Sequence, residues 1–153
     1  MRPTVDLGLK EKLELISFEI AGQEFCIDIH HVREIRGWTA VTPVPQSASA
    51  MMGVINLRGA VMPVIDLRQR LGFGATVPTS RHVIIVGQDG SRVAGFLVDA
   101  VQEALQIDAD LPQDPPENPE DSGLIDAIIP LDGRMLSRLV MNAMLPQEAK
   151  AAA

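Results

Sequence analysis

The chain has 153 residues, of which 46% are hydrophobic, enough to bury the core of one domain but too few for two independent domains. Its formal net charge is -7, and only 3% of its residues are aromatic. A negative field repels nucleic acid and anionic membranes, and binding of single strands relies on aromatic stacking. We therefore expect no nucleic-acid partner and no direct membrane insertion.

The acidity is concentrated in one segment. From Asp108 to Asp132 there are eight acidic residues and no Lys or Arg, whereas the remainder is close to neutral. Cys26 is the only cysteine, which excludes an internal disulfide and fits a reducing compartment. The first residues lack the apolar run of a signal peptide, and no stretch suits a membrane span. The chain is therefore expected to be cytoplasmic.

The first part of the chain predicts a loose leader followed by a hairpin. Residues 1–12 form the leader. Leu13 to Ile20 alternates apolar and polar side chains, which is typical of a half-buried strand. After a turn at residues 21–24, Phe25 to Ile29 completes the hairpin. His31 to Gly37 fits either a short helical turn or a bent continuation of the strand.

A second hairpin occupies the centre of the chain. Ser47 to Met52 predicts a brief helix with Ser47 as its cap. The hairpin follows, with Arg58 in its turn. Pro63 in the second strand cannot donate a ladder hydrogen bond, which predicts a sheet edge or a bulge. Asp66 to Gly72 predicts one helical turn, capped by Asp66 and ended by the glycine.

The rest of the chain is a succession of short strands with no long helix between them. We expect strands at Arg81–Gly87, Arg92–Val98 and Val101–Ile107, an exposed mobile loop at 108–122, a hairpin of Leu124–Leu131 and Arg134–Val140, a terminal helix at Met141–Leu145 and a frayed tail at 146–153. This spacing predicts one all-β domain over residues 13–145, built as a barrel, a sandwich or a pair of barrels.

Arg58 is the most informative side chain of the central hairpin. It stands at the tip between Asn56-Leu57 and Gly59, where there is no core for it to serve. An exposed guanidinium on a rigid hairpin suits carboxylate recognition, which favours a protein-binding domain over a catalyst. The alternative is a plain solvated turn residue.

A metal or nucleophile site is the competing hypothesis. Cys26, Asp28 and His30 alternate along one strand face, with His31 and His82 as further candidate ligands. Chance alternation is the simpler explanation, because no helix N-terminus near the cysteine is available to activate it. The chain has no calcium-loop, nucleotide-binding or hydrolase motif. We expect no metal, no cofactor and no catalytic residue.

Five blocks in order resemble the CheW-like chemotaxis coupling proteins. They are Glu34–Gly37 (EIRG), Gly53–Gly59 (GVINLRG), Pro63–Arg68 (PVIDLR), Gly95–Asp99 (GFLVD) and Leu131–Leu136 (LDGRML), and the resemblance runs from about Leu13 to Leu145. It implies two intertwined SH3-like five-stranded β-barrels around a common core, with short helical turns and a C-terminal helix. It also implies a non-catalytic adaptor that couples the cytoplasmic tips of transmembrane chemoreceptors to the regulatory domain of the histidine kinase CheA.

The resemblance also implies where the partners bind. A receptor-binding groove would use Val32, Glu34, Gly53, Asn56 and Arg58, with Val98 and Val101 beneath. From its own chemistry, Gly53 is a structural residue whose backbone a side chain would hinder. The kinase contact of this family resembles edge-to-edge packing of the first barrel, which here would involve the outer strand faces near residues 13–29, without assignable single residues.

Two further points follow from the resemblance. The family often carries an aromatic residue after a Pro-Glu pair, used in a second kinase contact that closes receptor-array rings. Here Pro116-Glu117 is followed by Asn118, which predicts a weak second contact. The same module could also serve a kinase outside chemotaxis, because the sequence does not specify its partner.

Overall fold

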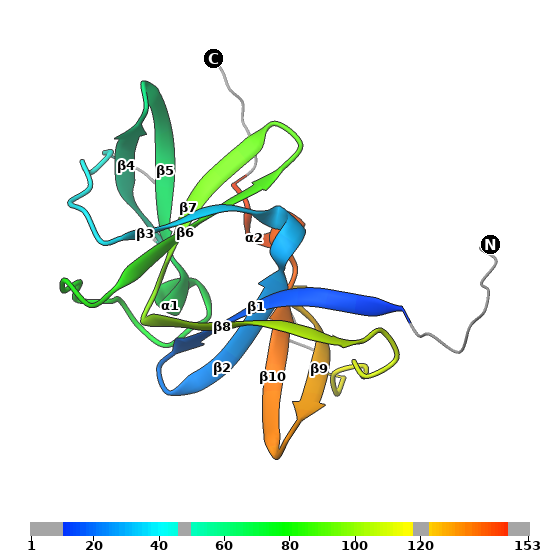
Figure 1. Ribbon diagram of the computed structural model, residues 1–153. Coiled ribbons are helices and arrows are strands. Elements are labelled where there is room, and N and C mark those ends of the chain that lie inside the picture. The colour runs from blue at the N-terminus through cyan, green and yellow to red at the C-terminus, as the bar shows by residue number, and fades with distance from the viewer. Residues whose placement is uncertain (1–10, 46–49, 118–122, 147–153) are drawn as a thin grey trace.

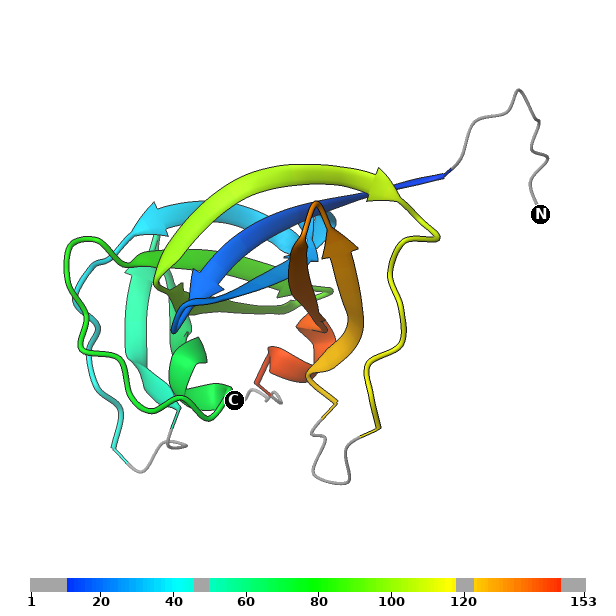
Figure 2. The ribbon, with the colours of Figure 1, turned by 90° about the horizontal axis from the view of Figure 1, so that it is seen from below.

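The computed structural model describes residues 11–45, 50–117 and 123–146 as two five-stranded mixed sheets. The first sheet has the order β8-β1-β2-β10-β9 and the second β3-β6-β7-β5-β4. We call them the first and second barrel; they form the two lobes of Figure 1, and Figure 2 shows them from below. The expected all-β fold of two five-stranded units is confirmed.

The second barrel is a continuous segment placed between strands of the first. The first barrel comprises β1 (Lys12–Ile20), β2 (Gln23–Asp28), β8 (Ala100–Asp108), β9 (Ile125–Leu131) and β10 (Arg134–Leu139). The second comprises β3 (Val32–Gly37), β4 (Met51–Leu57), β5 (Ala60–Asp66), β6 (Val83–Asp89) and β7 (Arg92–Val98). Three short helical elements complete the fold: η1 (Ile29–His31), α1 (Leu67–Arg70) and α2 (Met141–Met144).

Both barrels close in the same way, by pairing of the segment after one edge strand with the opposite edge strand. After β3, Thr42 and Val54 of β4 exchange two backbone hydrogen bonds of 2.9 Å. After β8, Gln113 and Ile128 of β9 do the same at 2.9 and 2.8 Å. The line where Thr42 meets β4 is called the seam of the second barrel below.

Three hydrophobic clusters hold the molecule together. One lies inside the first barrel, around Leu15 and Ile129, and another inside the second, around Val64 and Leu97. The third and largest lies between the barrels and includes Phe18 from the first and Phe96 from the second. We call this third cluster the shared core.

Several strands bury both of their faces because they belong to two clusters at once. In β6, Ile84 packs inside the second barrel while Ile85 packs in the shared core. In β1, Leu15 lies inside the first barrel, and Ser17 is also buried, with its Oγ donating to the Glu103 carbonyl at 3.3 Å. The expected half-buried strand at residues 13–20 is therefore wrong over its central residues.

The central hairpin differs from expectation in two places. Met51 and Met52 lie in strand β4 and not in a helix, and residues 46–49 lie outside the described residues. Pro63 lies in β5, which is an inner strand, so the expected edge position is wrong. Pairing of β5 with β7 begins only at Val64, so the missing N–H of Pro63 leaves no hydrogen bond to β7 unmade. The register shift of this hairpin falls in β4, between Met51 and Gly53.

Other local expectations are confirmed where the structure describes them. The Asp66 carboxylate caps α1 and accepts from the Gln69 amide, and Gly72 follows the helix with φ +92°. The exposed, mobile loop expected at 108–122 is an exception in its described part, because Gln113 pairs with Ile128 of β9 and Leu111 packs against the first-barrel cluster. The structure does not describe residues 1–10, 118–122 and 147–153. The predictions for most of the leader, for Asn118 and for nearly all of the tail therefore lie outside the described residues.

The terminal helix α2 joins the first barrel to the second. Met141 is buried in the shared core, and its side chain fills the space beside Gly87 of β6, where a Cβ would lie 2.6 Å from the Met141 Cε. Arg92 of β7 donates to the Pro146 carbonyl at 3.4 Å, and Arg70 donates to the Ala143 carbonyl at 3.4 Å. The last described element is thereby fixed to the inserted barrel.

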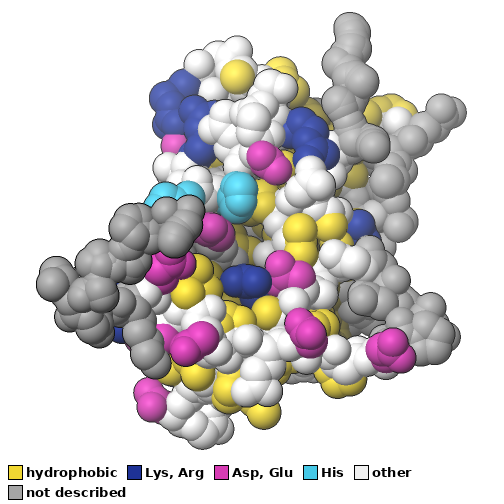
Figure 3. Space-filling view, turned by 90° about the vertical axis from the view of Figure 1, so that its right-hand side faces the viewer, with side chains coloured by type: hydrophobic (Ala, Val, Ile, Leu, Met, Phe, Trp, Pro, Cys, Tyr) yellow, Lys and Arg dark blue, Asp and Glu magenta, His cyan; other side chains and the backbone are white. Residues whose placement is uncertain are grey.

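Charge is unevenly divided between the barrels. In Figure 3, most Lys and Arg side chains gather in the upper part, over the second barrel, and most acidic side chains in the lower part, over the first. The sequence has the same asymmetry, with its acidic run between Asp108 and Asp132. No helix among the described residues has the length and apolar character needed to cross a membrane.

The shared core predicts that the barrels unfold together. Phe96→Ala removes a ring that is 1% exposed and packs against residues of both barrels, so we expect a loss of about 3–5 kcal/mol in unfolding free energy. Trp38, which packs on the second-barrel cluster, reports that barrel by fluorescence, while circular dichroism reports all strands. In both wild type and variant, the two signals should change at the same denaturant concentration; separate midpoints would refute the shared core.

Candidate functional site

Arg58 is presented by a tight turn that the hairpin sequence builds. Arg58 and Gly59 have φ of +54° and +89°, the pattern of a type I′ turn, whose twist matches that of the flanking strands. The Asn56 side-chain oxygen accepts from the Gly59 amide at 2.9 Å and fixes the loop. The Arg58 side chain is 62% exposed. Asn56 therefore shapes the turn from within, and the guanidinium extends from its tip.

Glu34 of β3 receives this guanidinium from across the seam. Its carboxylate pairs with Arg58 through one oxygen and with Arg36 Nη1 through the other at 3.2 Å. Hydrogen bonds from Arg58, then from Arg36, lower the pKa of Glu34, and the same contact raises the pKa of Arg58. Because β3 and β4 are opposite edges of the sheet, this ion cluster spans the closure of the second barrel.

The cluster of Glu34, Arg36 and Arg58, called the seam triad below, carries two cations for one anion. Glu34 and Arg36 lie on one face of β3 because side chains two apart on a strand share a face. Sequence reasoning selected Glu34 and Arg58 but did not select Arg36 as a site residue. The two-residue spacing within the EIRG block was the signal that could have found it.

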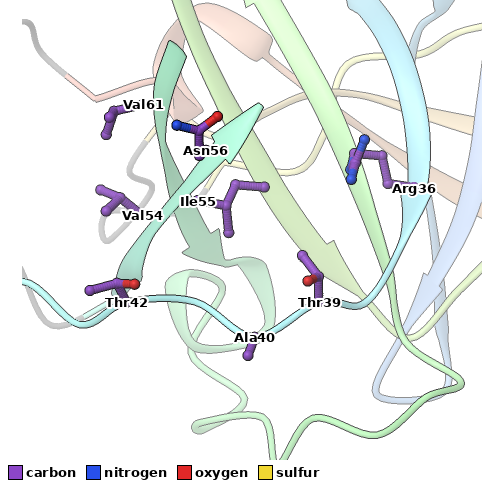
Figure 4. Close-up of a pocket in the computed structure, with 8 residues that line it drawn as sticks. All are labelled: Arg36, Thr39, Ala40, Thr42, Val54, Ile55, Asn56 and Val61. Atoms are coloured by element: carbon purple, nitrogen blue, oxygen red, sulfur yellow. The ribbon is translucent and has the colours of Figure 1, made fainter. Parts of the chain in front are cut away.

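A pocket of about 370 Å³ opens beside the seam triad (Figure 4). Val54 and Val61 project from the β4–β5 hairpin and Arg36 from β3; Thr39, Thr42 and Asn56 also line it. Val61 is 71% exposed. The buried Nε of Arg36 has no hydrogen-bond partner within the described ranges. The pocket thus places exposed apolar side chains next to positive charge, a combination that is typical of surfaces that bind proteins.

Gly53 has a structural role at this seam. A Cβ on Gly53 would lie 2.2 Å from the Thr42 carbonyl oxygen and 2.7 Å from its carbonyl carbon. Both are backbone atoms, which cannot rotate away. The absence of a side chain at Gly53 allows the segment after β3 to reach β4 and form the Thr42–Val54 bridge.

The three valines lie at the junction of the barrels. Val98 is 1% exposed and belongs to the shared core, while Val32 and Val101 are half-buried and pack against it. Val98 thus lies beneath the surface, as the resemblance implies, and acts through packing. The structure brings Gly53, Asn56, Arg58 and Glu34 together at the seam, while Val32 begins the strand that holds Glu34, and Val98 and Val101 pack in or against the shared core.

The strands near residues 13–29 occupy the middle of the first sheet. β1 lies between β8 and β2, and β2 lies between β1 and β10. Their hydrogen-bonding edges are therefore already paired, and the edge strands of this sheet are β8 and β9. A partner strand that extends this sheet would therefore meet β8 or β9, while a kinase contact on the outer strand faces near residues 13–29 stays a prediction.

The candidate metal face does not assemble. Cys26 is 0% exposed inside the first barrel, and burial raises the pKa of its thiol to about 12. Asp28 Oδ1 caps η1 by accepting from the His30 amide at 2.9 Å; burial raises the pKa of Asp28, but hydrogen bonds from His30 outweigh it and lower the pKa overall. His82 lies elsewhere, 3.5 Å from Asp99. In the described part of the chain, no three metal-ligating side chains converge.

The buried thiol gives a test at Cys26. Because its pKa is raised, the thiol stays protonated at pH 8 and should resist alkylation until the protein is unfolded. The raised folded-state pKa also fixes the sign of the pH effect: the contribution of the protonated Cys26 thiol to stability is complete below about pH 9, its ordinary pKa, and is lost as pH rises toward 12. Cys26→Ser should lower stability by about 1–3 kcal/mol and Cys26→Ala by less, measured by urea unfolding.

The close approach at Gly53 gives a second test. Gly53→Ala should destabilise the protein by about 1–3 kcal/mol, because the new methyl group meets backbone. Gly37→Ala is the matched control: a Cβ there has no neighbour within 4 Å, so its effect should stay within about 0.5 kcal/mol. Equal midpoints in urea for Gly53→Ala and the control would show that the seam tolerates a side chain.

Comparisons with known proteins match most of the length of this chain. A family model described as "CheW-like domain" matches residues 14–149. The chain is 46% identical over 143 residues to "Chemotaxis protein CheW" of Rhizobium meliloti (strain 1021), covering 92% of each chain, and 32% identical over 152 residues to the protein of the same name from Bacillus subtilis (strain 168), covering 98% and 96%. The crystal structure of the scaffolding protein TtCheW from Thermoanaerobacter tengcongensis superposes with a TM-score of 0.79 at 30% identity, over 85% of this chain and 90% of that one.

Proposed function

Since this chain belongs to the CheW family and is a non-catalytic chemotaxis scaffold, we propose that it joins the cytoplasmic tips of methyl-accepting chemoreceptors to the histidine kinase CheA. In this proposal the receptor contacts Val32, Glu34, Gly53, Asn56 and Arg58, with Val98 and Val101 supporting the surface from beneath. The protein would then reside in the cytoplasm, associated with the membrane through its receptor. The same surfaces would serve a kinase outside chemotaxis if that were the partner.

The observation that carries the receptor proposal is the seam triad. Arg58 is exposed, and its carboxylate partner Glu34 is shared with Arg36, so positive charge is left over at the surface. Glu34 orients the guanidinium and limits its rotamers, which lowers the entropy that binding costs. The neighbouring pocket, with exposed Val61 at its rim, accepts an apolar side chain. A helical partner with an apolar anchor and an acidic residue fits this pattern.

The kinase contact is proposed on a different surface, the first barrel. Its edge strands β8 and β9 lie in the other sheet from the seam triad. Separate surfaces allow one adaptor to hold two partners at once. Variants at the seam should therefore separate the two interactions.

Arg58→Asn tests the receptor contact without disturbing the turn. Asparagine adopts positive φ more readily than arginine, and Asn-Gly is a preferred type I′ pair, so stability should stay equal or rise. Removal of the guanidinium should weaken binding to a receptor hairpin fragment roughly tenfold or more, as for other arginine anchors. Co-sedimentation with receptor fragments and kinase measures both interactions.

Arg58→Glu and Glu34→Lys provide the charge-inverting arms of the same experiment. Each should reduce receptor binding while kinase binding survives, because the inverted charge lies on the receptor side only. Normal receptor binding by Arg58→Asn and Arg58→Glu would remove the seam triad from the receptor contact. Simultaneous loss of both partners, with an unchanged unfolding midpoint, would show that the two surfaces are not separate.

A further inference from the structure

Asp99 lies at the point where the chain crosses from one barrel to the other. β7 of the second barrel ends at Val98, and β8 of the first begins at Ala100. Asp99 is therefore the single residue between two strands that belong to different sheets. A crossover this short transmits any change in the angle between the sheets directly to its own backbone and side chain.

The polar atoms of Asp99 contact both barrels. On the first-barrel side, its amide donates to the Glu19 carbonyl at 3.0 Å, and its Oδ2 accepts from the Ala21 amide at 2.9 Å. On the second-barrel side, its Oδ1 lies 3.5 Å from Nε2 of His82, in the segment before β6. One carboxylate thus bridges the β1–β2 turn and the entry to β6.

The hydrogen bond from Thr79 to His82 indicates which nitrogen of the imidazole carries the proton. Nδ1 accepts from the Thr79 amide at 3.0 Å, so it carries no proton, and the proton of the neutral ring is on Nε2, which faces Asp99. The His82 carbonyl accepts from the Trp38 amide at 3.1 Å, at the end of β3. Both the imidazole, 15% exposed, and the carboxylate, 28% exposed, are held away from bulk water.

We propose that His82 and Asp99 are positioning residues that fix the angle between the two barrels. A hydrogen bond from Thr79 to His82, a 3.5 Å contact between His82 and Asp99, and a hydrogen bond from Ala21 to Asp99 together cross the junction over the shared core. Val98 and Val101 flank Asp99, so the crossover also sets the junction beneath the proposed receptor surface; only this last consequence rests on the proposed function. Neither residue needs to touch a partner.

A simpler role for Asp99 is confined to the first barrel. Ala21 has φ +53° and precedes Gly22 in a type I′ turn, a conformation that is unfavourable for alanine. The Asp99 carboxylate could serve this turn alone, as Asn56 does in the β4–β5 hairpin. The two roles differ in whether a change at Asp99 reaches the second barrel.

Distances between the barrels decide between these roles. Val61→Cys in β5 and Met135→Cys in β10 place spin labels on exposed positions of different barrels, and native Cys26 is sealed in the core and stays unlabelled. In this background, Asp99→Ala and His82→Phe should each broaden the label-to-label distance distribution measured by pulsed electron paramagnetic resonance. Asp126→Asn is the matched control, since it breaks a 2.8 Å ion pair with Arg138 between β9 and β10 of one barrel, and it should leave the distribution unchanged.

Amide hydrogen exchange gives the second readout on the full chain without labels. Asp99→Ala should raise the exchange rate of the Ala21 amide roughly threefold to tenfold, as expected for loss of a partly buried hydrogen bond, and should also raise the rate of the Thr79 amide, whose exposed hydrogen bond to His82 loses the support of Asp99. His82→Phe should raise the rate at Ala21 although it does not touch that turn. Faster exchange at Ala21 alone, with an unchanged distance distribution, would overturn the proposal and leave a local turn cap.

Receptor binding is measured last on Asp99→Ala and His82→Phe without the two added cysteines, because Val61 lines the pocket of the proposed receptor site. Weaker receptor binding by His82→Phe at an unchanged unfolding midpoint supports the positioning role. Unchanged receptor binding despite a broadened distance distribution would show that His82 and Asp99 fix the angle between the barrels without affecting the receptor surface. If the wild type fails to bind receptor fragments, the proposed function fails, while the distance and exchange results still decide the inference.

Discussion

The shared core is the constraint on which the rest of the molecule depends. β1, β6 and β7 each place alternate side chains into two different clusters, so these strands have no solvent face over their central residues. A shift of one residue in any of them would move large side chains out of two cores at once. The barrels are therefore locked in register with each other, and every surface feature, including the seam triad, has a fixed position relative to both lobes.

The proposed receptor site lies at one closure of this rigid frame. The second barrel closes where Thr42 meets β4, and Gly53 permits that approach. The ion cluster of Glu34, Arg36 and Arg58 crosses the same line, so the structural closure coincides with the charged surface that we propose for docking. The seam triad has two cations for one anion, whereas acidic side chains predominate over the first barrel, so the two barrels present surfaces of different charge.

Features that depend on residues close together in the chain were predictable from sequence, whereas features that depend on the closure of a barrel were not. The Asp66 cap and the Arg58 turn follow from residues adjacent in the chain. Period-two alternation failed at Leu15 and Cys26, because a strand buried on both faces offers no polar side to read. The pairing of Glu34 with Arg58 depends on two opposite sheet edges meeting, and no local pattern encodes that distance.

The position of Met141 beside Gly87 has a consequence for the order in which the molecule is made. On the ribosome, the β1–β2 hairpin emerges first and exposes apolar residues on both faces, with neither β8 nor β10 yet available to cover them. The inserted second barrel then appears whole, but its outer cavity at Gly87 stays empty until α2 is synthesised some fifty residues later, by the numbering of the chain. Nascent chains thus pass through a long interval with unpaired strand edges, in which association with other chains competes with folding.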